Sequence, residues 1–206
     1  MVVKNNYSVI VIYNAVSGLL DETTRSLKTQ GSNVVLVVND SKRYDFIQAE
    51  KIIYNKKNLG IAEAQNIGIR FALENGASQI AIFDQDSKVP KDYLNLMNHS
   101  LVSANSQIGN IGLITPKIYD MNMKSFVEPR IYSYKKGKLI ITMPKDSRRE
   151  TIDKETIRLA AKPIASGSIV PAATFNKVGL MDSKLFIDLV DTDFDLRILL
   201  SGMNIV

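Results

Sequence analysis

The stretch Ser78-Gln-Ile-Ala-Ile-Phe-Asp84-Gln85-Asp86-Ser87 is the most informative part of this chain. Its apolar run predicts a buried strand, and two carboxylates one residue apart follow the end of that strand. Open α/β sheets bind ligands beyond the carboxyl ends of their strands, and Mg²⁺ and Mn²⁺ take oxygen ligands alongside substrate phosphates. Asp84 and Asp86 therefore predict a metal-dependent site for a phosphorylated substrate. The same residues also suit a polar turn that merely ends a strand.

Apolar runs and amphipathic segments alternate along the chain on both sides of this stretch. Runs rich in β-branched residues predict strands at 7–13, 33–38, 51–54, 79–83 and 111–115. Helical spacing of apolar residues predicts helices at 16–29 and 61–75, and another from Pro90 to about residue 104. Strands that alternate with helices are typical of βαβ units, so we expect an α/β fold with a mostly parallel central sheet and flanking helices.

The pattern changes after Pro116. Alternating polarity at 126–134 and 138–142 predicts a hairpin around Lys136-Gly137, and the polar stretch 144–154 predicts a loop. A strand is expected at 162–170 and helices at 172–178 and 190–201. We expect one domain over 1–206, with a nucleotide-binding half at 1–115 and an acceptor-side half at 116–206. Residues 202–206 predict the opening of another strand, so the domain is expected to be truncated at its C-terminal side.

The composition is that of an ordinary globular protein. The chain has 206 residues, of which 45% are hydrophobic and 23% charged. It has no Cys, which excludes a disulfide framework and a Cys-ligated zinc. No apolar run reaches the roughly 18 residues of a membrane span, and the start lacks the apolar region of a signal peptide. These features favour a cytoplasmic location.

Positive charge is concentrated in one segment. Residues 117–162 hold 12 Lys and Arg against 6 Asp and Glu, whereas the whole chain has a net charge of +5. The segment is either a solvated loop or a surface attracted to anionic lipid, which would place the protein on the inner face of the membrane. Aromatic residues are not interleaved with the Lys and Arg residues, so nucleic acid is not an expected partner.

Polar residues follow each predicted parallel strand, and such strand ends lie along one edge of a sheet. They are Tyr13-Asn14, Asp40, residues 55–60, and Asp84 to Asp86. A carboxylate such as Asp40 can accept the N–H of a pyrimidine base. Gly60, at the start of a helix, would let backbone N–H groups approach a ligand. The preference of turns for polar residues would explain each of these positions singly, but together they favour a nucleotide site.

This order of motifs resembles that of family-two glycosyltransferases, which have the nucleotide-diphospho-sugar transferase (GT-A type) fold. Five stretches carry the resemblance: Val9–Asn14, Val37–Ser41, Asn58–Gly68, Phe83–Asp86 and Phe186–Arg197. Within them, Gly-Ile-Ala-x-Ala-Gln-Asn, Phe-Asp-Gln-Asp-Ser and Phe-Ile-Asp-x-Val-Asp look like the rhamnosyltransferase branch. That branch is similar to enzymes that use dTDP-L-rhamnose to build bacterial surface polysaccharides.

The resemblance implies a role for each matched residue. Tyr13, Asn14 and Asp40 would line the base and ribose, and Gly60, Asn66 and Gln85 would complete the binding site for the nucleotide-diphospho-sugar donor. Asp86 would bind Mg²⁺ or Mn²⁺, with Asp84 on the metal or the ribose, and Asp191 would be the general base. Two residues depart from the family pattern: Val190 replaces a Glu, and Gln65 stands where many relatives have Arg.

The implied reaction is an inverting displacement onto a saccharide or lipid-linked saccharide. Asp188, Asp193 and Asp195 lie close to Asp191 in sequence, and like charges make a carboxylate more basic. Asp193 is expected on the opposite side of the helix, where its replacement should cost little. The alternative for this acidic cluster is a solvated helix N-terminus.

Two other functions remain open. Asp84-Gln-Asp86 also resembles the motif of haloacid-dehalogenase-like phosphatases, in which the first Asp is a nucleophile. There the motif follows the first strand, whereas here it follows the fourth. The second alternative is a non-catalytic nucleotide-sugar-binding remnant. Ser166-Gly167 is expected to form either a turn facing the sugar or a kink in a strand.

Overall fold

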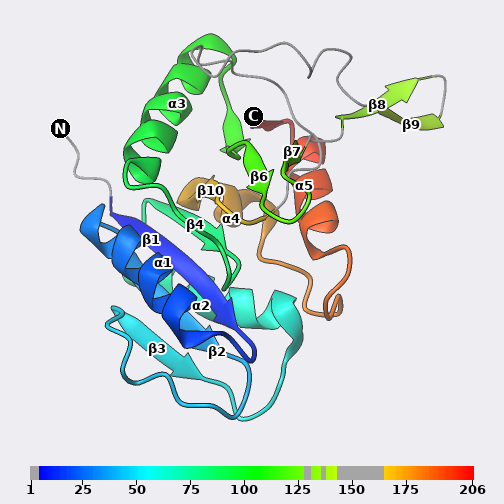
Figure 1. The fold of residues 1–206 in the computed structure, drawn as a ribbon. Coiled ribbons are helices and arrows are strands. Elements are labelled where there is room, and N and C mark those ends of the chain that lie inside the picture. The colour runs from blue at the N-terminus through cyan, green and yellow to red at the C-terminus, as the bar shows by residue number, and fades with distance from the viewer. Residues whose placement is uncertain (1–4, 128–130, 136–137, 143–164) are drawn as a thin grey trace.

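A five-stranded sheet forms the centre of the protein. The computed structural model describes residues 5–127, 131–135, 138–142 and 165–206 (Figure 1). The strands β1 (Asn6–Ile12), β2 (Asn33–Val38), β3 (Lys51–Tyr54) and β4 (Gln79–Phe83) are parallel, and β10 (Ser168–Pro171) runs antiparallel to β4. The order across the sheet is β10-β4-β1-β2-β3. The predicted mostly parallel sheet is confirmed.

Helices cover both faces of this sheet. On one face lie α1 (Ser17–Thr29) and α3 (Tyr93–Gln107), and on the other lie α2 (Gly60–Glu74), α4 (Ala172–Val178) and α5 (Val190–Leu200). Alternate residues of β1 divide between the two layers: Val9 and Val11 pack with α2, whereas Ile10 and Ile12 pack with α1. Because the strands are buried on both faces, their sequences are continuous apolar runs.

A short second sheet joins the middle of the chain to its end. β5 (Ile111–Leu113) pairs in parallel with β11 (Asn204–Ile205), so the strand expected to open at 202–206 is present. Ile114 then forms an antiparallel bridge with Ile169 of β10. These pairings fix α5, which precedes β11, against the central sheet.

The region after β5 differs from the sequence prediction. The expected strand at 126–134 is divided, because β7 (Ser125–Val127) pairs with β6 (Ile118–Asp120) and β8 (Ile131–Lys135) pairs with β9 (Lys138–Thr142). The Asp120 carboxylate accepts the N–H groups of Asn122 and Met123, which turns the chain between β6 and β7. The strands of the predicted hairpin at Lys136-Gly137 are confirmed, whereas residues 136–137 and the predicted loop 144–154 lie outside the described residues.

The strand expected at 162–170 begins later, at Ser168. Ser166 and Gly167 form a turn in front of it, with Gly167 at φ +77°. Residues 162–164 lie outside the described residues. No helix in the described parts of the chain combines the length and apolar sequence of a membrane span.

Candidate functional site

The carboxyl end of β1 is bonded to the loop after β4. The Gln85 side-chain carbonyl accepts the Tyr13 N–H at 2.7 Å, and the Gln85 amide donates to the Tyr13 carbonyl at 3.0 Å. Tyr13 itself is exposed. The parallel sheet therefore brings Tyr13, Asn14, Gln85 and Asp84 together, as the sequence predicted. Gln85 uses both of its polar atoms to hold the end of β1.

Asp40 connects this edge to the end of β2. Its carboxylate accepts the N–H of Asn14 at 2.5 Å, the N–H of Lys42 at 2.7 Å and the hydroxyl of Tyr44 at 3.2 Å. Asn14 has a left-handed backbone with φ 52°, which Asn tolerates better than most residues. Asp40 thus shapes the surface beside the strand ends while remaining partly exposed.

Asn39, which was not among the predicted site residues, organises the loop from β3 to α2. The Asn39 amide donates to the Asn58 side chain at 2.8 Å and to the Gly60 carbonyl at 3.2 Å. Its carbonyl oxygen accepts from the Asn55 side chain at 3.1 Å and from the Leu59 N–H at 2.9 Å. The signal for this role was a polar residue directly after the apolar strand β2, because a polar side chain that is buried there needs hydrogen-bond partners.

The Asp84 carboxyl group lies in a setting that disfavours its charged form. The pKa of the Asp84 carboxyl is raised above its ordinary value, first by loss of water and then by the charges of Asp86 and Asp191. Asp84 is exposed as a residue, although protein atoms crowd its carboxyl group. Ser166 supports the loop, because its hydroxyl accepts the Asp84 N–H at 3.2 Å and lies 2.6 Å from the Ser87 hydroxyl.

The Asp84 and Asp86 pair fits a divalent cation. Hard cations take carboxylate oxygens, and both side chains carry them. Among the described residues there is no group of three or more acidic, His or Cys side chains that could hold a metal. Mg²⁺ in phosphate sites is commonly held by one or two carboxylates together with substrate oxygens and water, and this pair suits that arrangement.

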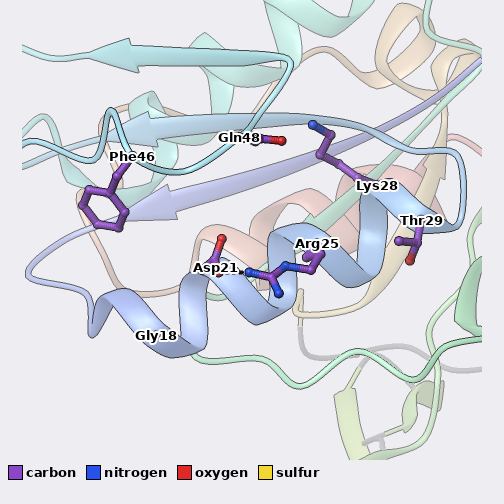
Figure 2. A pocket seen from close by; sticks show the side chains of 7 residues that line it. All are labelled: Gly18, Asp21, Arg25, Lys28, Thr29, Phe46 and Gln48. Atoms are coloured by element: carbon purple, nitrogen blue, oxygen red, sulfur yellow. Dashed lines mark hydrogen bonds and ion pairs between the residues drawn. The ribbon is translucent and has the colours of Figure 1, made fainter.

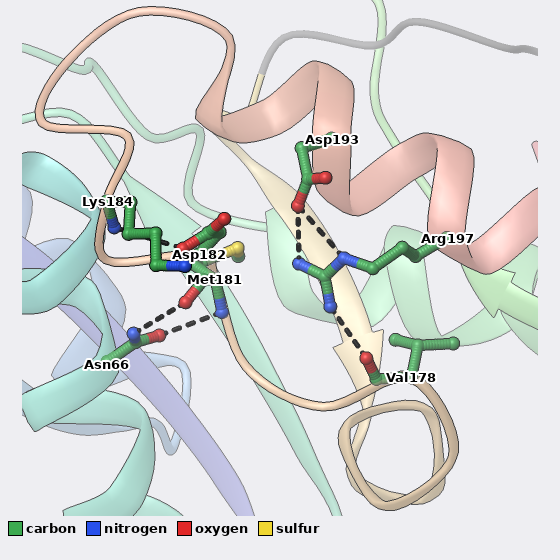
Figure 3. Close-up of polar contacts among 7 residues, drawn as sticks. All are labelled: Asn66, Val178, Met181, Asp182, Lys184, Asp193 and Arg197. Carbon is green, nitrogen blue, oxygen red and sulfur yellow. Dashed lines mark hydrogen bonds and ion pairs between the residues drawn. The ribbon is translucent and has the colours of Figure 1, made fainter.

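Gly60 and Asn66 contact the segment before α5. A Cβ atom at Gly60 would overlap the carbonyl oxygen of Phe186, and that carbonyl accepts the N–H of Ile61 at 2.7 Å. Both amide atoms of the buried Asn66 are bonded to the backbone of Met181 (Figure 3). Both residues thus contact the segment before α5, and their direct contact with the donor stays a prediction.

Asp193, whose replacement is expected to cost little, has a partner in the structure. The Arg197 guanidinium forms an ion pair with the Asp193 carboxylate at 2.8 Å and donates to the Val178 carbonyl at 2.6 Å (Figure 3). Asp193 therefore stabilises the connection between α4 and α5. Asp191, at the other side of the first turn of α5, is the acidic residue whose charge reaches Asp84.

A separate hollow lies beside α1. It has a volume of about 680 Å³ and is bounded by α1 and by the chain after β2, from which Phe46 and Gln48 project (Figure 2). Arg25 in this hollow is paired with Asp21 of the same helix. None of the residues that line it belongs to the edge formed by Tyr13, Asp40 and Asp84. The candidate site is therefore the strand edge and not this hollow.

Comparison with known families identifies the chain. The family described as glycosyl transferase family 2 matches residues 8–161, which include Tyr13, Asp40, Asp84 and Asp86. The chain belongs to glycosyl transferase family 2. Among curated proteins, the dTDP-rhamnosyl transferase RfbF of Shigella flexneri is 34% identical over 208 residues, covering 97% of this chain. The chain spans 65% of the length of that relative.

Solved structures confirm the GT-A type α/β fold expected for this family 2 chain. GalNAc-T7 with UDP, GalNAc and Mn²⁺ superposes with a TM-score of 0.70 at 15% identity, over 97% of this chain and 41% of that one. S. aureus TarS 1–349 gives a TM-score of 0.63 at 14% identity, over 98% of this chain and 57% of that one. The phosphatase alternative is not favoured, since family and fold both point to the glycosyltransferase.

Proposed function

We propose that this family 2 glycosyltransferase moves L-rhamnose from dTDP-rhamnose to a saccharide or lipid-linked saccharide acceptor. The observation that carries the proposal is the strand edge at which Gln85 is bonded to Tyr13 and Asp40 to Asn14, with Asp84 and Asp86 on either side of Gln85 in the chain. The identity of 34% to a dTDP-rhamnosyl transferase supports rhamnose as the sugar. The non-catalytic alternative predicts donor binding without turnover.

The pyrimidine base and ribose bind beside Tyr13, Asn14 and Asp40. Asp40 accepts the base N–H with the free lone pairs of its carboxylate, which is already oriented by the Asn14 N–H and the Tyr44 hydroxyl. Gln85 holds the Tyr13 backbone in place, so the exposed ring of Tyr13 lies at a fixed point of the edge.

The diphosphate lies at the end of β4. Asp86 and Asp84 would hold Mg²⁺ or Mn²⁺ there, and a cation so held would supply positive charge for the leaving diphosphate. Ser166 positions the Asp84 backbone from the turn before β10.

Asp191 acts on the acceptor. Its carboxylate takes the proton of the acceptor hydroxyl as the hydroxyl oxygen forms a bond to the anomeric carbon. The bond from that carbon to the diphosphate breaks on the opposite face, and its electron pair leaves with the nucleotide. The configuration of the sugar is therefore inverted. In this arrangement residues 1–115 form the donor half and residues 116–206 the acceptor half of one domain.

We further propose that the protein works in the cytoplasm, on the inner face of the membrane, through residues 117–162. The positive charge of this segment suits anionic lipid. Exposed apolar side chains of the β6–β7 hairpin, Tyr119, Met121, Met123 and Phe126, add surface that a bilayer interface can bury. Co-sedimentation with anionic vesicles, weakened by salt and absent with neutral vesicles, would support this contact.

Turnover tests the activity. The chain is incubated with dTDP-rhamnose, Mn²⁺ and lipid-linked saccharides, and both dTDP and the extended saccharide are measured. Formation of both products in equal amounts is expected, with UDP-GlcNAc as the comparison donor giving much less. Binding of dTDP-rhamnose without any product would favour the non-catalytic alternative.

A further inference from the structure

The segment 179–189 links α4 to α5 and is attached to distant parts of the molecule. Its central attachment is Asn66 of α2, which forms a reciprocal pair with the backbone of Met181 (Figure 3). The Asn66 amide donates to the Met181 carbonyl at 2.8 Å, and the Met181 N–H donates to the Asn66 carbonyl oxygen at 2.9 Å. Asn66 is 3% exposed and Met181 5%, so water has little access to either hydrogen bond.

A second attachment lies at the start of α2. The Ile61 N–H donates to the Phe186 carbonyl at 2.7 Å, which occupies an N–H group that a helix start leaves free. Gly60 permits this contact, because it has φ +80° and no side chain where the Phe186 backbone passes. The first turn of α2 therefore binds the protein's own segment.

A third attachment lies where the segment begins. Arg197 of α5 donates to the Val178 carbonyl at 2.6 Å and is held by Asp193, one turn earlier on α5, at 2.8 and 2.9 Å (Figure 3). The segment is thus fixed before it starts, in its middle and near its end.

The segment ends in a strained residue two positions before Asp191. Leu189 has a left-handed backbone with φ 65°, a conformation that is unfavourable for residues other than Gly. Leu189 is exposed, so its own side chain contributes little packing to offset that cost. Such a conformation persists when the surrounding structure fixes it. The three attachments provide that constraint, and they determine where α5 starts.

We propose that Asn66 is a positioning residue that holds segment 179–189 and thereby places the first turn of α5, which carries Asp191. The inference rests on the proposed function for the role of Asp191. An amide is suited to the task because it carries a donor and an acceptor in one plane, and so it satisfies both backbone groups of Met181. Loss of the amide would leave two buried backbone groups without partners, and the segment would have to move to reach water.

Hydrogen–deuterium exchange of the full chain tests the proposal without any activity assay. Asn66→Ala removes both bonds, and Asn66→Leu removes them while filling a similar volume, which separates the bonds from simple packing. Both variants should exchange faster than wild type at the backbone amides of 181–190, while the amides of β1 and β4 keep their protection. Wild-type protection of 181–190 in Asn66→Leu would overturn the proposal. Faster exchange throughout the sheet would also overturn it, because the role of Asn66 would then be global.

Asn98→Ala is the matched control. Asn98 of α3 accepts a hydrogen bond from the buried Gln79 side chain at 2.7 Å, so its loss removes one amide contact of the same kind elsewhere. This control should leave the exchange of 181–190 unchanged. An equal loosening of that segment in Asn98→Ala would contradict a specific role for Asn66.

Kinetics adds a second test. A displaced Asp191 should lower kcat roughly 10–100-fold, because small misplacements of a reacting group are costly, while the affinity for dTDP-rhamnose stays within about twofold. A parallel loss of donor affinity would mean that Asn66 supports the donor site instead. If the wild-type chain itself fails to bind dTDP-rhamnose, the proposed function fails, and the exchange result still decides whether Asn66 holds the segment.

Discussion

Asp84 follows the end of β4, and the charge of Asp191, in the first turn of α5, acts on it although the two residues are far apart in the sequence. The charge of Asp191 contributes to the raised pKa of Asp84, after loss of water and the charge of Asp86. The relationship links the loop after β4 to the start of α5.

Asp84→Asn should raise the melting temperature near neutral pH. The folded-state pKa of Asp84 lies above the ordinary value of 3.8, so its ionisation favours the unfolded chain as pH rises through the folded pKa. The gain should therefore shrink as pH falls towards about 4, where the wild-type carboxyl is protonated as well. Thermal unfolding of both proteins across this pH range, without divalent cations, is the measurement.

Asp45→Asn is the control with the opposite sign. The pKa of Asp45 is lowered from 3.8, first by the hydrogen bond from the Tyr54 hydroxyl and also by Arg43. Its ionised form stabilises the folded state above that pH, so this variant should melt lower near neutrality and lose the difference in acid. Shifts of the same sign in Asp45→Asn and Asp84→Asn would contradict the account of Asp84.

Asp40→Ala should weaken the binding of dTDP-rhamnose about tenfold to a hundredfold. A charged hydrogen bond to the base contributes about 1.5–3 kcal/mol, which corresponds to that range of affinity. Calorimetric titration measures it. Asp45→Ala lies in the same loop and also loses a tyrosine contact, yet it should keep wild-type affinity. Equal losses in both variants would attribute the effect to the loop and not to the base.

Asp191→Asn should lower kcat by about 10²–10⁴ and leave donor affinity nearly unchanged, as expected for a general base. Turnover and donor titration on the same preparation separate the two quantities. Asp182→Asn is the control, since this exposed carboxylate of the segment before α5 accepts a local N–H, that of Lys184. Full turnover by Asp191→Asn would assign the base elsewhere.

Gly60→Ala should destabilise the fold more than Gly31→Ala does. Both glycines have φ near +80°, but only at Gly60 would a Cβ atom meet other atoms, those of Phe186. The backbone cost at Gly31 is about 1–2 kcal/mol, and overpacking at Gly60 should add roughly 1–3 kcal/mol. Urea unfolding measures both. Equal effects would show that segment 179–189 moves away from Gly60 at little cost.

The central sheet was predictable because its signals are local. Uninterrupted apolar runs such as 33–38 and 79–83 predict buried parallel strands, and the structure has strands with those bounds. The polar residues after the strands were predictable as a group for the same reason. Parallel pairing alone brings Tyr13, Asp40 and Asp84 to one edge.

The contacts of Asn66, Gly60 and Gln85 within the chain were not predictable in this way. Their donor contacts stay predictions, but each residue also meets a backbone segment that is remote in sequence, such as Met181, 115 residues from Asn66. A sequence pattern shows that a polar or flexible residue is needed at a position. It does not show whether a ligand or another part of the chain satisfies that need.

The central claim is tested most directly by calorimetric titration of the chain with dTDP-rhamnose, with Mn²⁺ and again with excess chelator. Saturable binding is expected with the cation, at one donor per chain. Chelator, or Asp86→Ala with its fold intact, should abolish that binding. Undiminished binding in chelator and in Asp86→Ala would contradict a cation-dependent donor site at the end of β4.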